Sequence, residues 1–353
     1  MLYTVVVSIA IEPLSKLPIS AVQSFLISYD HDPATIAWKY YDPSFNGRRE
    51  RAFACIDDQG KVVSFLGLIP FTVMHNGKRI DAAWSCDWYR DPDASGPLGI
   101  MLIRHSLKTY PLIYSFGGSE ITRAIMGRLS KVTIPTAGLE LYKPLRAGGV
   151  LYVLQKAGPV KHLPSFAAVN NIRLPLKSYR NNKELTVNLL AALPAALGDV
   201  LSDRLTDGHV AAYDLPYLRW LLERCPAITG GVCLVSRGEE ALGAILFWRP
   251  VTDRRFWRVA LLPRRRHYEA LEVGLRRVAH HIRDNGGWLV SLLASRLDKD
   301  LLELASRNGF HRSNSRRPLY ILTREPDAAV QELEQLSYLD TDYAYRFPVW
   351  NRP

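Results

Sequence analysis

Apolar and polar positions in the first third of this chain alternate between a strand-like and a helix-like spacing. Two extended apolar runs, Lys61–Thr72 and Lys78–Tyr89, are joined by the turn His75-Asn76-Gly77 and predict a β-hairpin. The amphipathic segment Ile100–Thr109 then predicts a helix, and the short apolar run Leu112–Phe116 predicts a further strand. The pattern therefore places strand, strand, helix and strand in succession.

Further elements surround this unit. Strands are expected at Met1–Ile11, Arg51–Ile56 and Ala137–Leu145, helices at Ser20–Ser28 and Glu120–Leu129, and a loop or short helix at Tyr29–Asn46. The pattern breaks up over residues 148–182, where several prolines stand among basic residues, and this composition is typical of a linker. The Ala/Leu-rich segment Leu185–Val200 is expected to be helical, with an interruption at Pro194.

The same order of elements then returns. It is expected as a helix at Leu215–Arg224, strands at Val232–Ser236, Ala241–Trp248 and Phe256–Leu262, a helix at Tyr268–Arg283, a strand at Trp288–Leu293, a helix at Asp298–Arg307 and a strand at Arg317–Thr323. Helix, hairpin, strand, helix, strand, helix and strand thus occur twice, which indicates an internal structural repeat. We expect domains at residues 1–147 and 206–353, with 148–205 as a linker or crossing segment.

Length and composition agree with two globular domains. A chain of 353 residues with 48% hydrophobic and 22% charged residues is long enough for two cores. No apolar run reaches the roughly 20 residues that span a bilayer, so no membrane span is expected. Met1–Ile11 is apolar but lacks the basic region of a secretory signal, which favours a cytoplasmic protein.

The charge and the cysteines limit the partners. A net charge of +11 suits anionic partners such as nucleotide cofactors or nucleic acid, and it suits equally a basic surface without a dedicated role. The densest basic patch is Arg254, Arg255, Arg258 and Arg264–Arg266. The four cysteines lie in or beside apolar runs without a CxxC pair, so we expect buried free thiols and no metal site.

One stretch has the sequence of an anion site. The strand that ends near Asp87–Tyr89 feeds a loop containing Gly96 and Gly99, and a helix follows. A glycine-bearing loop that opens a helix directs backbone N–H groups and the positive end of the helix dipole at a phosphate or another anion.

Three stretches carry a resemblance to the GNAT superfamily of acyl-CoA N-acyltransferases. Asp57–Gly67 resembles its first hairpin, Asp87–Gly99 its central strand and pyrophosphate loop, and Leu301–Phe310 its helix ending in Gly-Phe. The resemblance implies an α/β (α+β) chain of two tandem GNAT-like domains, each a mixed, mostly antiparallel twisted sheet flanked by helices. The aromatic stretch Trp38-Lys39-Tyr40 before the first hairpin is similar to that of a GNAT subgroup that is often associated with polysaccharide or cell-surface biosynthesis.

The resemblance also implies a donor and an acceptor. The donor would be acetyl-CoA or another acyl-CoA, and the acceptor the amine of a sugar, an amino acid or a related metabolite. The implied cofactor-binding residues lie in the first domain and are Trp88, Tyr89, Ser95, Gly96, Pro97, Leu98, Gly99 and Ile100. The family's loop usually has Arg or Gln where Ser95 or Ala94 stands here, and the second loop, Pro263–Ala270, has no glycine. Ala305 stands where family members often place a Tyr acid, so the second domain is expected to be degenerate.

Acyl transfer to an amine needs a base and a proton for the leaving thiolate. Asp87 at the end of the central strand and Glu120 after Leu112–Phe116 are the candidate bases, and Tyr142 is a candidate acid. Glu120 fits equally the first turn of a helix, where the dipole favours a carboxylate. Tyr142 fits equally a packed strand residue.

Two other hypotheses stay open. Tandem GNAT-like chains also resemble the Fem-type transferases, which take an aminoacyl group from tRNA, and the basic charge suits that partner. The second alternative hypothesis is a degenerate tandem of GNAT-like domains that has no activity and only binds a partner or a nucleotide. Either hypothesis, like the first, is compatible with a homodimer.

Overall fold

The computed structural model describes residues 9–45, 49–157, 167–178, 184–203, 209–264, 268–324, 332–340 and 345. The chain divides into two compact units. Unit 1 comprises Met1–Thr72, Ile80–Thr133 and Tyr320–Val330, and unit 2 comprises Val73–Arg79, Ile134–Leu319 and Gln331–Pro353. The expected boundaries near residues 147 and 206 stay predictions.

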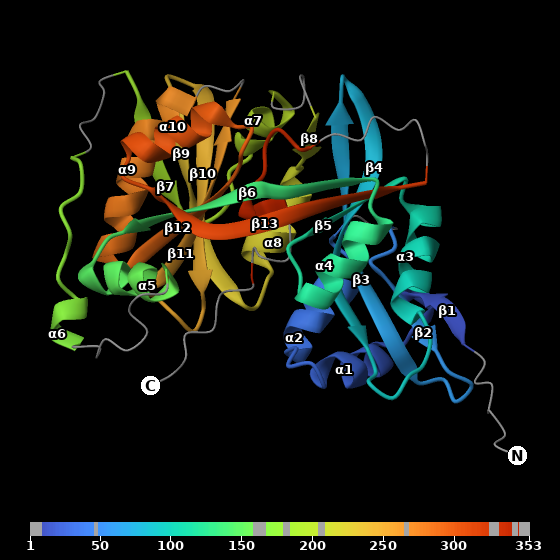
Figure 1. The fold of residues 1–353 in the computed structure, drawn as a ribbon. Helices are drawn as coiled ribbons and strands as arrows, with labels where there is room; N and C mark the ends of the chain where they lie inside the picture. The colour runs from blue at the N-terminus through green and yellow to red at the C-terminus, as the bar shows by residue number, and fades with distance from the viewer. Residues whose placement is uncertain are drawn as a thin grey trace, which may run out of the picture. The chain divides into compact units, whose positions relative to one another are not determined.

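Unit 1 is built on a mixed sheet with helices on its faces (Figure 1). Its strands are β1 (Ala10–Pro13), β2 (Ala52–Ile56), β3 (Val62–His75), β4 (Lys78–Arg90) and β5 (Leu112–Phe116), in that spatial order. Its helices are a 3₁₀ turn at Leu14–Lys16, α1 (Ile19–Ile27), α2 (Pro33–Ile36), a π-helix at Ala37–Tyr41, α3 (Leu98–Thr109) and α4 (Glu120–Leu129). Pairing is antiparallel for β1/β2 and β2/β3 and parallel for β4/β5.

Unit 2 repeats this plan with more elements. Its strands are β6 (Val132–Pro144), β7 (Thr186–Leu190), β8 (His209–Ala212), β9 (Ile228–Arg237), β10 (Glu240–Pro250), β11 (Phe256–Pro263), β12 (Leu289–Ser295) and β13 (His311–Thr323). Its helices are α5 (Ala147–Ala157), α6 (Ala167–Asn170), α7 (Leu197–Asp203), α8 (Leu215–Glu223), α9 (Tyr268–Asp284), α10 (Lys299–Arg307) and a 3₁₀ turn at Tyr338–Asp340. The sheet order is β13-β6-β12-β11-β10-β9-β7, with β11/β12 parallel.

These arrangements confirm the predicted fold class and most predicted elements. The β3–β4 turn has Asn76 at φ +49° and Gly77 at φ +75°, the left-handed backbone of a tight hairpin turn. The apolar stripe of α9, Leu271, Leu275, Val278 and Ile282, is at most 1% exposed and packs on β9–β12. All four cysteines are buried free thiols, as expected.

One expectation about the middle of the chain was wrong. Leu185–Val200 is not one helix, because Thr186–Leu190 forms β7 and pairs antiparallel with β9 before α7 begins at Leu197. The alternation of Thr186, Val187, Asn188 and Leu189 is a strand pattern that the Ala/Leu content concealed. The described parts of 148–205 also contribute α5, β7 and α7 to unit 2. The expected strand Met1–Ile11 lies mostly outside the described residues; β1 begins at Ala10.

The basic patch predicted around Arg254–Arg266 is largely dispersed. Arg258 is buried at 2% exposure, Arg255 pairs with Asp253, and Arg264 pairs with Asp203 at 2.5 Å and with Glu240 at 3.0 Å. Arg265 and Arg266 lie outside the described residues. Within the described part of the chain, no helix combines the length and the apolarity needed to cross a bilayer.

A buried histidine pair in unit 2 predicts a loss of stability in acid. His209 is 1% exposed, and its Nδ1 lies 3.1 Å from Nδ1 of His75. Burial, and then the neighbouring His75, lower the pKa of His209 to about 4, against the opposing effect of Glu334. Between pH 6.5 and 4 the unfolded chain therefore binds a proton that the folded chain does not, so the free energy of unfolding falls as the pH falls.

We expect that loss to be about 2–3 kcal/mol between pH 7 and pH 4. Urea unfolding at several pH values measures it, and His209→Gln should flatten the slope in this window. His280→Gln, on the outer side of α9, is the matched control and should leave the slope unchanged. Equal slopes for wild type and His209→Gln would contradict this account.

Candidate active site

Strands β4 and β5 of unit 1 pair for only part of their length. The parallel register joins Ala82–Trp84 to Leu112–Tyr114. β4 then continues to Arg90, and β5 ends at Phe116. Among the described residues no further pairing joins these two strands, so they part beyond Trp84 and Tyr114.

Asp87 lies just past this opening and has an unusual backbone. Its φ of +46° is rare for a residue other than glycine, and it interrupts the alternation of side chains along β4. The Asp87 side chain is buried, and its Oδ2 accepts hydrogen bonds from Lys39 Nζ and from the Tyr40 hydroxyl, both at 2.5 Å. Such strain persists only where the surroundings fix it, which is common at functional sites.

Lys39 and Tyr40 are presented by the π-helix that follows α2. Asp32 caps α2 by accepting from the Thr35 amide at 2.8 Å, and Pro33 occupies its first turn. Arg51 then donates to the Lys39 carbonyl at 3.1 Å. A π-helix turn inside a helical segment is frequent at functional sites.

A histidine and a second tyrosine extend the network. His31 Nε2 lies 3.2 Å from the Tyr89 hydroxyl and 3.7 Å from Asp87 Oδ1. The Tyr89 ring stacks on Tyr29 with centroids 4.4 Å apart. Because both His31 and Tyr89 are only partly buried, this carboxylate–imidazole–phenol chain leads from the buried Asp87 toward solvent.

Close packing explains one glycine of the site. A Cβ on Gly67 of β3 would collide with the Tyr40 hydroxyl and would lie 3.0 Å from Cys86 Sγ. Only glycine therefore leaves Tyr40 room to reach Asp87.

The loop after β4 is organised by Asp91. Its Oδ1 accepts from the Asp93 amide at 3.1 Å, its carbonyl accepts from the Ala94 amide at 3.1 Å, and its Oδ2 pairs with Lys61 at 2.7 Å. The hydrogen bond and charge of Lys61 lower the pKa of Asp91, so the carboxylate stays ionised and keeps the loop closed.

The loop delivers the chain to the start of α3. Pro97 is the N-cap and offers no side-chain cap, and the first turn of α3 contains no acidic residue. The first amides of this 12-residue helix therefore lack the side-chain acceptor that usually satisfies them. Gly96, at φ +86°, has no atom within 4 Å of the place a Cβ would occupy, whereas the same place on Gly99 is filled by the Trp88 indole.

A groove of about 470 Å³ lies beside this loop. It is lined by Phe25 of α1, by Tyr29 just after α1, by Lys61 and by Asp91 and Pro92 of the loop. Tyr29 donates its hydroxyl proton to the Arg90 carbonyl at 2.7 Å, which places its ring between the groove and Tyr89.

Most of the site residues proposed from the sequence lie on one continuous stretch of chain, from the end of β4 to the start of α3. Asp87, Trp88 and Tyr89 lie at the end of β4, Ser95, Gly96 and Pro97 form the exposed loop, and Leu98, Gly99 and Ile100 begin α3. Helix α3 therefore begins at Leu98, two residues before the expected start at Ile100.

Glu120 and Tyr142 stand on elements other than β4 and its loop. Glu120 is exposed in the first turn of α4, after the Ser119 cap. Tyr142 belongs to unit 2, where it packs with Tyr152, Phe256 and Leu289. Burial, and then the charge of Glu140, raise the pKa of Tyr142, so Tyr142 holds its proton more tightly. Roles for both residues stay predictions.

Sequence analysis gave His31 no role and named Lys39 only within the resemblance of Trp38-Lys39-Tyr40, without assigning it to the site. His31 follows an exposed helix end and gave no signal. Lys39 stands between Trp38 and Tyr40, and a charged residue inside an aromatic run is a signal from which a buried ion pair could have been predicted.

Unit 2 has the corresponding opening, but its own chain fills it. β11 and β12 pair only over Phe256–Val259 and Leu289–Leu292. The segment 332–340 packs here with five buried residues, Leu333, Leu336, Tyr338, Leu339 and Asp340. Tyr338 donates to Glu140 Oε1 at 2.6 Å, and Tyr217 donates to the Leu339 carbonyl at 2.6 Å. A cavity of about 10 Å³ remains.

The comparisons with solved structures identify the fold. A probable N-acyltransferase of Enterococcus faecalis is 13% identical, with 89% of this chain and 72% of that chain covered and a TM-score of 0.56. A GCN5-related N-acetyltransferase of Anabaena variabilis is 12% identical, with 88% and 72% covered and a TM-score of 0.57. The N-myristoyltransferase of Saccharomyces cerevisiae with bound myristoyl-CoA is 11% identical, with 95% and 89% covered and a TM-score of 0.55.

This chain therefore has the GNAT fold, as the sequence resemblance implied. No family model matches the sequence. No curated protein matches it either.

Proposed function

We propose that unit 1 is an acyl-CoA-dependent N-acyltransferase with its site at the end of β4. The observation that carries this proposal is the parting of β4 and β5 directly before the uncapped start of α3. A bound acyl-CoA supplies an activated thioester. The amides at the start of α3 and the open backbone of Gly96 suit its diphosphate, because helix N-termini and left-handed glycines favour phosphate oxygens.

The two units differ in the features that a phosphate needs. The first turn of α3 has no carboxylate, whereas the first turn of α9 carries Glu269. A carboxylate at that place repels phosphate oxygens. The opening of unit 2 is also filled by residues 332–340. Both differences support one acyl-CoA site in each chain, in unit 1.

The polar network suits proton transfer from an amine. We assign the Tyr89 hydroxyl as the group that meets the acceptor's proton and His31 as the base that receives it from Tyr89. The C–N bond forms as the C–S bond of the thioester breaks, and the CoA thiolate that leaves takes up a proton from water. Asp87 Oδ1, 3.7 Å from Nε2, stabilises the imidazolium that forms. Lys39 and Tyr40 hold Asp87 in place through Oδ2. The apolar groove lined by Phe25 and Tyr29 suits the acceptor, an amine on a body that packs against aromatic rings.

A pair of glycine variants tests the phosphate loop. Gly96 and Gly60 both lie in unit 1, have φ of +86° and +80°, and have no atom within 4 Å of the place where a Cβ would stand. Valine at either position is strained by roughly 1–2 kcal/mol, so the two variants lose similar stability. Only Gly96→Val is expected to weaken CoA binding, by at least tenfold.

Isothermal titration with CoA, and thermal shift with acetyl-CoA, measure this difference. At about 100 times its dissociation constant the ligand should stabilise wild type and Gly60→Val by about 2.7 kcal/mol. Equal CoA affinity in Gly96→Val and Gly60→Val would place the site elsewhere. No CoA binding by wild type, together with salt-sensitive tRNA binding, would favour an aminoacyl donor instead.

A further inference from the structure

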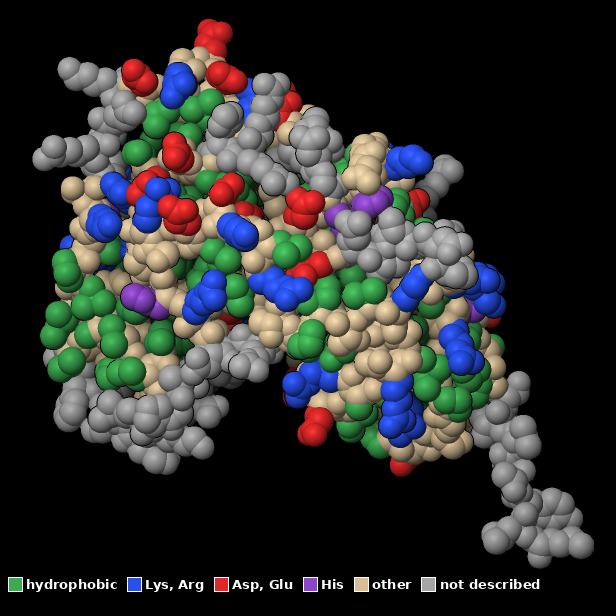
Figure 2. Space-filling model, turned by 45° about the horizontal axis from the view of Figure 1, so that its top comes forward, with side chains coloured by type: hydrophobic (Ala, Val, Ile, Leu, Met, Phe, Trp, Pro, Cys, Tyr) green, Lys and Arg blue, Asp and Glu red, His purple; other side chains and the backbone are tan. Residues whose placement is uncertain are grey.

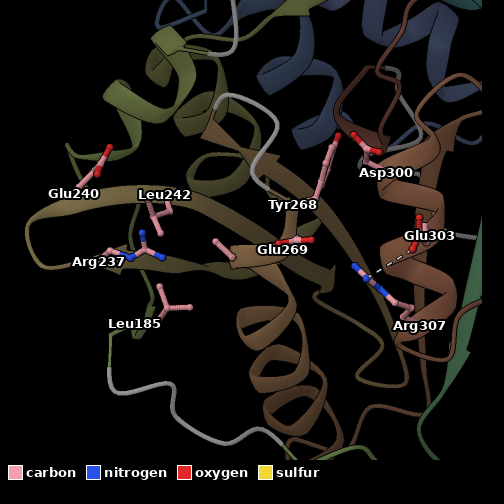
Figure 3. A pocket seen from close by; sticks show the side chains of 10 residues that line it. Leu185, Arg237, Glu240, Leu242, Tyr268, Glu269, Asp300, Glu303 and Arg307 are labelled. Carbon is pink, nitrogen blue, oxygen red and sulfur yellow. Dashed lines mark ion pairs between the residues drawn. The ribbon is translucent and has the colours of Figure 1, made fainter.

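Unit 2 has an open groove of about 630 Å³ that the proposed reaction does not use. It lies between the β9–β10 hairpin and the first turns of α9 and α10 (Figure 3). Its lining residues are Leu185, Arg237, Glu240, Leu242, Tyr268 and Glu269, with Ala270, Asp300, Glu303 and Arg307 completing it. This volume lies within the range of pockets that bind small ligands and exceeds the size of one amino acid.

The groove has an apolar floor and two charged ends. Leu242 and Tyr268 are 8% and 5% exposed and form part of the floor. Figure 3 shows Arg237 beside Leu242 and Leu185 at one end, and Asp300 and Glu303 at the other, with Glu269 between. Figure 2 shows carboxylate and basic side chains close together on the face of unit 2 turned toward the viewer.

Three charged groups of the groove have no partner among the residues that the structure describes. Among the described residues the Arg237 guanidinium and the carboxylates of Glu269 and Asp300 make no hydrogen bond or ion pair. In contrast, Glu240 pairs with Arg264 at 3.0 Å and Glu303 with Arg307 at 3.7 Å. The groups without a partner are therefore of both signs and face one cavity.

Both carboxylates lie in the first turn of a helix. Glu269 is the second residue of α9, and Asp300 is the second residue of α10. A carboxylate at this place interacts favourably with the positive end of the helix dipole. This end of the groove consequently attracts an ammonium group and repels phosphate, while Arg237 offers a planar donor to a carboxylate.

We propose that this groove binds a zwitterionic peptide of two to four residues. Its ammonium group would lie at Glu269 and Asp300, its carboxylate at Arg237, and its apolar side chains on Leu242 and Tyr268. The site is independent of the proposed acyl-CoA site, because its residues all belong to unit 2. Hydrogen bonds to charged groups contribute about 1.5–3 kcal/mol each, so each end accounts for at least a tenfold change in affinity.

The test uses the full chain and three forms of the tripeptides Ala-Leu-Ala and Ala-Phe-Ala. These have free termini, an N-acetyl group or a C-terminal amide, and their affinities are measured by titration calorimetry. For wild type, either cap should weaken binding at least tenfold. The double variant Glu269→Gln/Asp300→Asn should bind the free and the N-acetylated tripeptides with equal affinity. The variant Arg237→Gln should bind the free and the amidated tripeptides with equal affinity.

Two charge variants outside the groove serve as controls. Glu239→Gln in the same hairpin turn and Arg254→Gln in the loop before β11 should keep the wild-type response to both caps. The proposal is overturned if neither free tripeptide binds wild type saturably, or if each cap has the same effect in the groove variants as in wild type.

Discussion

Replacing Lys39 with methionine is expected to lower the free energy of unfolding by about 3–5 kcal/mol. The Lys39 ammonium is 2% exposed and lies 2.5 Å from an Asp87 carboxylate that is fully buried. Without it the carboxylate stays in the interior with its charge uncompensated, which costs far more than the lost attraction. Urea unfolding followed by circular dichroism measures the difference.

A double variant separates the buried charge from a packing defect. Lys39→Met/Asp87→Asn removes both charges and keeps a side chain that hydrogen-bonds, so it should regain at least half of the lost stability. Lys16→Met is the matched control: Lys16 pairs with Glu12 at 3.2 Å but is 68% exposed, and such pairs contribute about 0–1 kcal/mol. A double variant no more stable than Lys39→Met would contradict the assignment of a buried ion pair.

Replacing Tyr89 with phenylalanine is expected to lower kcat of acyl transfer about 100-fold to 1000-fold, with KM within threefold. The hydroxyl is the one atom removed, and it lies 3.2 Å from His31 Nε2. Its loss breaks the proton path from the acceptor amine while the ring still stacks on Tyr29. Release of free thiol from acetyl-CoA, measured with a panel of amino sugars, amino acids and short peptides, first identifies the acceptor and then yields both constants.

Two further variants make this result specific. His31→Gln should lower kcat to a similar extent, and the double variant should be little worse than either single one, because both residues act in one proton path. Tyr29→Phe removes the neighbouring hydroxyl, which bonds the Arg90 carbonyl, and should leave kcat within threefold. If Tyr29→Phe and Tyr89→Phe lose activity equally, the tyrosines only support the fold.

Most elements of the fold were predictable because their signals are local. The hairpin turn at Asn76-Gly77, the α9 stripe and the stop at Asn285-Gly286 depend on residues that are adjacent or one helical turn apart. The exception, β7, is a short edge strand whose alternation competes with a helix-forming composition, and its pairing with β9 decides its structure.

The site was predictable only in the part that lies along one strand and its loop. Asp87 and Gly96–Gly99 follow one another, so the sequence indicates their proximity. The partners of Asp87 come from a segment about 50 positions away: Lys39 lies in the π-helix and His31 before α2, and only tertiary packing brings both to Asp87. Similarly, no local pattern indicates that residues 332–340 fill the opening between β11 and β12.

Hydrogen–deuterium exchange with and without CoA tests the central claim most directly. If the amides at the end of β4 and the start of α3 hold the diphosphate, CoA should slow exchange in peptides covering residues 87–102. Peptides covering residues 256–284, the corresponding part of unit 2, should exchange at an unchanged rate. Protection confined to residues 256–284, or no protection in either region at saturating CoA, would contradict the account.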